Sequence, residues 1–145
     1  MSPQPSLPSS PATSGDSFTL YDLRVDVICP PGARILCGAK PGDHFFLEGE
    51  LLRMGEGTRG FSIYSLAAIL PLLPAKQRPT HAHDWMTTDA EVACPDPLCG
   101  SRLRITRIAK REFSHSEVSG VPLKEDDSQG ERLPTVTAPD SDMTA

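Results

Sequence analysis

The alternation of hydrophobic and polar positions predicts two strands near the start of the chain. Leu23, Val25 and Val27 would share one face of an extended segment, with charged residues between them on the other face. We therefore expect a half-buried strand over 18–29, ended by the Pro-Pro-Gly turn that follows it. A second strand is expected over 44–52, directly after a Pro-Gly-Asp turn.

A change to helical spacing predicts one main helix over 63–73. Ser62 is in position to cap this helix by accepting a hydrogen bond from a first-turn backbone N–H. Because Pro71 lacks a backbone donor, we expect the helix to end or tighten there, with Pro74 closing the segment. The apolar positions that share this spacing are Ile63, Leu66, Ala67, Leu70 and Leu73.

Two shorter strands are expected in the second half of the chain, over 89–94 and 102–109. A loop over 75–88 precedes them, and a turn with two prolines joins them. The order strand, strand, helix, strand, strand leaves no room for several crossover helices. The sequence therefore predicts an α+β fold, a small and mostly antiparallel sheet of about four strands with one main helix packed on a face.

The composition confines this fold to the middle of the 145 residues. Residues 1–16 are almost entirely Pro, Ser, Ala, Thr and Gly, and residues 114–145 are polar and acidic. Neither segment has the clustered apolar side chains that would offset the entropy of ordering. We expect a disordered Pro/Ser-rich tail, a single domain over 17–113, and a disordered acidic tail.

The charge and the apolar runs exclude several classes of partner. Residues 114–145 carry seven acidic and two basic side chains, which accounts for the whole formal net charge of −5. The remainder is nearly neutral, so no nucleic acid is expected as a partner. The longest apolar run, 63–73, is shorter than the roughly 20 residues that span a bilayer, so no membrane is expected either. We expect a cytoplasmic protein, since the first residues lack the apolar stretch of a secretory signal.

The four cysteines are the first candidates for chemistry. In a reducing compartment they are available as metal ligands, reactive thiols or buried apolar side chains. Zinc takes four soft ligands, and Cys94 and Cys99 have the close spacing of a ligand pair, whereas Cys29 and Cys37 are more widely spaced. A zinc or iron site is one interpretation, and buried free cysteines are the other.

Two further groups of side chains are candidates for the same chemistry. His81 and His83 would point the same way in an extended segment and would complete a mixed nitrogen and sulfur site with the cysteines, unless they lie in a solvated loop. Cys37 lies near basic residues that favour a thiolate nucleophile, with His44 or His83 as an activating partner, unless His44 simply begins the second strand and no such pair forms. Trp85 is interpreted as a core anchor or as the lid of a pocket.

The order of these motifs resembles a family of short, uncharacterised conserved hypothetical proteins of bacteria and archaea, many from anaerobes. The resemblance rests on Cys37, the following Pro-Gly-Asp-His-Phe turn, Gly60-Phe61, Asp84-Trp85 and Cys94-Pro95-Asp96. It implies cysteines at the two places where Cys37 and Cys94 stand. It does not indicate which activity, if any, the protein has. Similar proteins often have a further cysteine where this chain has Ser62, which weakens a metal or cluster role.

Three functions remain open at this point. The first is a small accessory or tailoring protein of a metabolic pathway, such as secondary-metabolite biosynthesis, with a small molecule or a pathway protein as partner. Its pocket would lie near Cys37, Trp85 and Cys94. The second is a metal-binding or redox module that uses the cysteines and histidines. The third is a non-catalytic interaction domain whose tails recruit partners.

Overall fold

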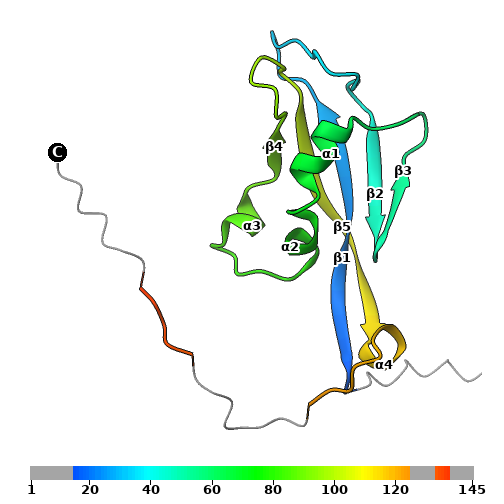
Figure 1. Cartoon of the computed structure of the whole chain (residues 1–145), viewed down its shortest axis with the longest axis vertical. Coiled ribbons are helices and arrows are strands. Elements are labelled where there is room, and N and C mark those ends of the chain that lie inside the picture. The colour runs from blue at the N-terminus through cyan, green and yellow to red at the C-terminus, as the bar shows by residue number, and fades with distance from the viewer. Residues whose placement is uncertain (1–14, 125–132, 138–145) are drawn as a thin grey trace, which may run out of the picture.

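A five-stranded antiparallel sheet organises the molecule, with the strand order β3-β2-β1-β5-β4 (Figure 1). The computed structural model describes residues 15–124 and 133–137, and the remaining parts of both predicted tails lie outside these ranges. All four strand pairings are antiparallel. The strands are β1 (Ser17–Ile28), β2 (His44–Glu48), β3 (Leu51–Met54), β4 (Glu91–Ala93) and β5 (Arg102–Ser114).

The long pair of β1 and β5 forms the centre of the sheet. Their register runs from Ser17 opposite Ser114 to Ile28 opposite Arg102, with one irregularity after Asp22. The alternation read from the sequence places every second side chain of β1 in the core, because successive residues of a strand point to opposite faces. The buried cluster consists of Leu23, Val25, Val27, Phe45, Leu47, Ile69, Leu73, Leu103 and Ile105.

Helices cover the core face of the sheet. Ile69 of α1 (Ile63–Ile69) and Leu73 of α2 (Leu73–Gln77) are both buried against the strands. Two further helical turns are α3 (Trp85–Thr88) and α4 (His115–Val118), and the second lies within the segment predicted as the acidic tail. Within the described residues, no helix has the length and apolar character needed to cross a membrane.

The α+β class and the mostly antiparallel sheet are confirmed, but the predicted four strands and one main helix are not exact. The expected strand over 44–52 is a hairpin of β2 and β3, in which Glu48 pairs with Leu51. Gly49 has a φ of 62° at the first position of the two-residue connection. Such a turn requires a left-handed first residue, which glycine adopts without strain.

The expected helix over 63–73 is two short helices. Pro74 does not close the segment, because it lies in the first turn of α2, where a missing backbone N–H leaves no hydrogen bond unmade. Ser62 takes the N-cap position of α1 without a side-chain capping bond. The segment over 75–88, expected as a loop, contains the end of α2 and all of α3.

Candidate metal centre

Three of the four cysteines meet at one end of the sheet. The ligand atoms of Cys37, Cys94 and Cys99 all lie within 4.8 Å of one another. Cys37 belongs to the connection between β1 and β2, and the other two belong to the connection between β4 and β5. Because Ile28 at the end of β1 pairs with Arg102 at the start of β5, both connections lie at the same end of the sheet.

Backbone contacts hold these two connections together. The N–H of Gly100 donates to the carbonyl of Arg34 at 2.8 Å. The N–H of Leu36 donates to Sγ of Cys99 at 3.3 Å. A side chain at Gly100 would be obstructed, because an added Cβ would lie 2.5 Å from Cβ of Ala33. Glycine at this position therefore permits the close approach that brings the cysteines together.

The turn from Cys94 to Cys99 is closed by its own hydrogen bonds. The carboxylate of Asp96 accepts from the N–H of Leu98 at 2.9 Å, and its carbonyl accepts from the N–H of Cys99 at 3.0 Å. The N–H of Cys94 donates to the carbonyl of Ser101 at 3.2 Å, which brings the two ends of the turn together. The turn therefore presents both of its sulfur atoms to Cys37.

Hydrogen bonds lower the pKa of the Cys99 thiol. The hydroxyl of Ser101, 3.2 Å from Sγ, together with the backbone N–H groups of Cys37 and Leu36, lowers the pKa of Cys99 to about 6. Burial raises the pKa of Cys94, and the neighbouring Cys99 adds to this effect. Hydrogen bonds to a sulfur stabilise its charged form, whereas burial without them disfavours it. Within the cluster, the pKa values of Cys94 and Cys99 are therefore shifted in opposite directions.

The separation of the sulfur atoms suits a tetrahedral metal ion. Sγ of Cys37 and Sγ of Cys99 lie 3.8 Å apart. Zinc binds thiolates at about 2.3 Å, so the edge of its tetrahedron between two sulfurs measures about 3.8 Å. Ser101, which is 4% exposed, places its hydroxyl 3.6 Å from Cys37 as well. This hydroxyl is a candidate to orient both sulfurs from outside the metal's own ligand set.

The structure does not bring Cys29 or the two histidines into this cluster. The thiol of Cys29 donates to the carbonyl of Ala33 at 3.4 Å. The rings of His81 and His83 contact each other edge to face at 4.9 Å, and both residues are exposed. Among the described residues, the three cysteines are the one group with three candidate ligands close enough to hold a metal ion.

The predicted partners of a Cys37 nucleophile also lie elsewhere. Nδ1 of His44 is 2.9 Å from the carbonyl of Gly42, and its ring meets Phe46 edge to face. Trp85 is 71% exposed on α3, so it is not the core anchor that its size suggested. The described residues thus form no hydrogen-bonded cysteine–histidine pair, and the thiol with a lowered pKa is that of Cys99.

Two site residues, Gly100 and Ser101, were not found from the sequence. Gly100 allows close contact with Ala33, which is 67 positions away along the chain. Ser101 is buried beside two of the sulfur atoms. Their place directly after Cys99 is the one signal that the sequence offers.

The chain matches no protein-family model, no curated protein and no solved structure. The resemblance to a family of conserved hypothetical proteins and the role in a metabolic pathway therefore stay predictions, as does the cytoplasmic location.

Proposed function

We propose that this protein is a metal-binding module that holds one zinc ion per chain through Cys37, Cys94 and Cys99. The convergence of three free thiols from two connections, with ligand atoms within 4.8 Å of one another, carries the proposal. A cysteine binds a metal as the thiolate, so the hydrogen bonds that lower the pKa of Cys99 favour binding of a cation.

The polar surroundings of the sulfurs favour metal binding over simple burial. A cysteine that serves only as an apolar side chain would pack within the hydrophobic core. Cys99 is buried, but it lies outside the apolar cluster that forms the core of the described residues. Sγ of Cys99 instead faces the N–H of Leu36 and the hydroxyl of Ser101. Such donors stabilise negative charge on sulfur and orient the lone pairs that a metal uses.

The number of ligands favours zinc. Structural zinc sites take four protein ligands, whereas sites with three keep one position for water or another ligand. The described residues supply three, which corresponds to the second type. Iron–sulfur clusters are generally held by four cysteines, so iron is the weaker candidate for this set.

The test compares four serine variants of the full chain. Cys37→Ser, Cys94→Ser and Cys99→Ser each remove one ligand, and Cys29→Ser is the matched control because its thiol lies outside the cluster. Each protein is purified without oxygen, supplied with zinc, freed of excess metal and analysed for bound zinc and titratable thiols. We expect about one zinc per chain in the unchanged protein and in Cys29→Ser, and a marked loss in the other three.

Thiol titration gives an independent readout. With zinc bound, we expect one freely reacting thiol per chain, that of Cys29, and release of the other three by a chelator. Cobalt in place of zinc should give a charge-transfer band that weakens when any of the three ligands is removed. Four freely reacting thiols after zinc treatment, or equal zinc content in Cys99→Ser and Cys29→Ser, would show that the proposal is wrong.

A further inference from the structure

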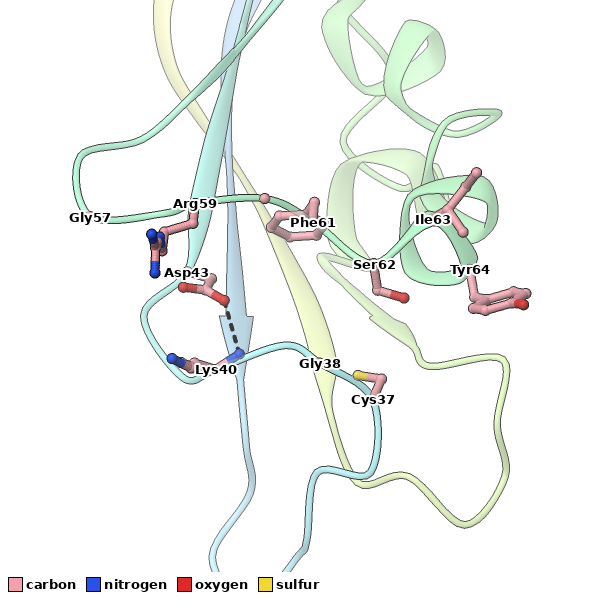
Figure 2. A pocket seen from close by; sticks show the side chains of 11 residues that line it. Cys37, Gly38, Lys40, Asp43, Gly57, Arg59, Phe61, Ser62, Ile63 and Tyr64 are labelled. Atoms are coloured by element: carbon pink, nitrogen blue, oxygen red, sulfur yellow. Dashed lines mark hydrogen bonds between the residues drawn. The ribbon is translucent and has the colours of Figure 1, made fainter.

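A pocket of about 650 Å³ opens beside the metal centre, with Cys37 in its wall (Figure 2). Two segments line it, 37–43 from the connection that carries Cys37, and 57–64 leading into α1. The volume lies within the range of about 300–1,000 Å³ that is typical of sites for small molecules. The pocket therefore has room for an organic molecule next to a sulfur atom.

The charged side chains gather at one end of this pocket. Figure 2 shows Lys40, Asp43 and Arg59 on one side of the view, and Cys37 with Tyr64 on the other. Asp43 is engaged locally, because its carboxylate accepts from the backbone N–H of Lys40 at 2.9 Å. Within the described ranges, neither the ammonium of Lys40 nor the guanidinium of Arg59 has a hydrogen bond or an ion pair. Two cations are thus available to a ligand, and one acid partly offsets them.

Three large side chains, those of Phe61, Ile63 and Tyr64, line the pocket together with glycines and Ser62. Phe61 is anchored by an edge-to-face contact with the buried ring of Phe45 at 4.9 Å between centroids. Ile63 and Tyr64 are 72% and 75% exposed, so their apolar surface is accessible to a ligand in the pocket. A wall of this kind fits the carbon skeleton of a ligand better than an inorganic ion.

We infer that this pocket binds a small organic carboxylate, with its charged group toward Lys40 and Arg59 and its carbon chain along Phe61 toward Cys37. Two cations and one acid leave a net charge of about +1, which matches a carboxylate better than a doubly charged phosphate. A guanidinium also matches the planar, two-oxygen geometry of a carboxylate. The inference goes beyond the metal site and stands on the pocket itself.

The test uses two alkylating reagents of nearly equal size on the metal-free, reduced full chain. Iodoacetate is an anion and iodoacetamide is neutral, and each transfers its two-carbon group to a thiolate with loss of iodide. The initial rate at each cysteine is read by peptide mass spectrometry. Cys29, which does not line the pocket, is the control within the same sample. Because metal is removed first, the result does not depend on the zinc proposal.

We expect the iodoacetate-to-iodoacetamide rate ratio to be about tenfold higher at Cys37 than at Cys29, through attraction of the anion into the pocket. Arg59→Gln and Lys40→Gln should each lower the ratio at Cys37 severalfold. Arg53→Gln is the matched control, because this arginine pairs with Glu48 outside the pocket and its loss should leave the ratio unchanged. Added salt should reduce the difference.

Protection from iodoacetamide tests the carbon chain and the charge together. Hexanoate should slow the reaction at Cys37 at lower concentrations than hexanamide or phosphate, and should do so less well in Arg59→Gln. Equal rate ratios at Cys37 and Cys29, or equal protection by hexanoate and hexanamide, would overturn the inference. Stronger protection by phosphate than by hexanoate would also overturn it, in favour of a phosphate-bearing ligand.

Discussion

Replacing Gly100 by alanine should separate the β1–β2 connection from the β4–β5 connection, which together carry the three cysteines of the proposed metal centre. The added Cβ would lie 2.5 Å from Cβ of Ala33 and 3.2 Å from both N and O of Arg34. Ordinary contacts begin at 3.4 Å, so the connections must move apart by about 0.9 Å. Two of the three close atoms belong to backbone, which cannot turn away as a flexible side chain would.

A movement of this size is large for a metal site. Metal–ligand distances in proteins hold within about 0.2 Å of their preferred values, and Cys37 would be carried away from Cys99 along with Arg34. Changes that displace ligands without removing them typically lower metal affinity about 10- to 100-fold. We expect Gly100→Ala to bind zinc within this reduced range, which corresponds to a loss of about 1.4–2.7 kcal/mol.

The assay is a competition titration in which a coloured chelator and the protein share a limited amount of zinc. Gly38→Ala is the matched control, because an alanine next to Cys37 meets nothing within 4 Å at that position. Circular dichroism establishes that both variants keep the sheet. If Gly100→Ala bound zinc as tightly as Gly38→Ala, the close approach of the two connections would not be what assembles the site, and the reasoning would be refuted.

Two further predictions concern the stability of the fold. The side-chain hydrogen bonds from Arg111 hold the pKa of buried Asp22 below its usual value. The ionised carboxylate therefore stabilises the folded state at pH values above the carboxyl pKa of the unfolded chain. This stabilisation is lost as the pH falls through the lower pKa of the folded state. Urea unfolding between pH 7 and pH 3 should show less acid sensitivity for Asp22→Asn than for the unchanged chain, and equal sensitivity would contradict this role. Phe45→Ala should lower the free energy of unfolding by about 3–5 kcal/mol because the ring is fully buried. Trp85→Ala should change it by less than about 0.5 kcal/mol, and a larger loss would contradict the exposure of Trp85.

The strands could be predicted because their signal is local. Alternation in β1 follows directly from a strand with one buried face, and the residues at 23, 25 and 27 show it without reference to the rest of the chain. The β2–β3 hairpin was missed because apolar residues resume at Leu51 and Leu52 after a short interruption, which also fits one continuous strand. A glycine between two apolar segments also fits a β-bulge in a single strand. The pairing of Glu48 with Leu51 is what makes Gly49 part of a hairpin turn.

The proposed metal centre could be predicted only in part, because most of it depends on contacts between residues that are distant in the sequence. The Cys94–Cys99 pair is visible as a local spacing, but the contribution of Cys37 depends on which connections the sheet topology brings to one edge. The lowered pKa of Cys99 depends first on the nearby hydroxyl of Ser101, and then on backbone donors more than 60 residues away along the chain, such as the N–H of Leu36. The two histidines had an equally suggestive spacing, and nothing local separates them from true ligands.

The position of the cysteines relative to the core bears on what a metal would do here. Small zinc domains in which the metal supplies the folding energy have few other buried side chains. Among the residues that the structure describes, nine apolar side chains form a core between the sheet and the helices α1 and α2, and the three cysteines lie beyond the ends of β1 and β4. This core is a source of stability apart from the cysteines, so we propose that zinc binds to a sheet that is already formed. A three-ligand zinc site keeps one position for water or another ligand, which is the arrangement expected where the metal binds a ligand instead of stabilising the fold.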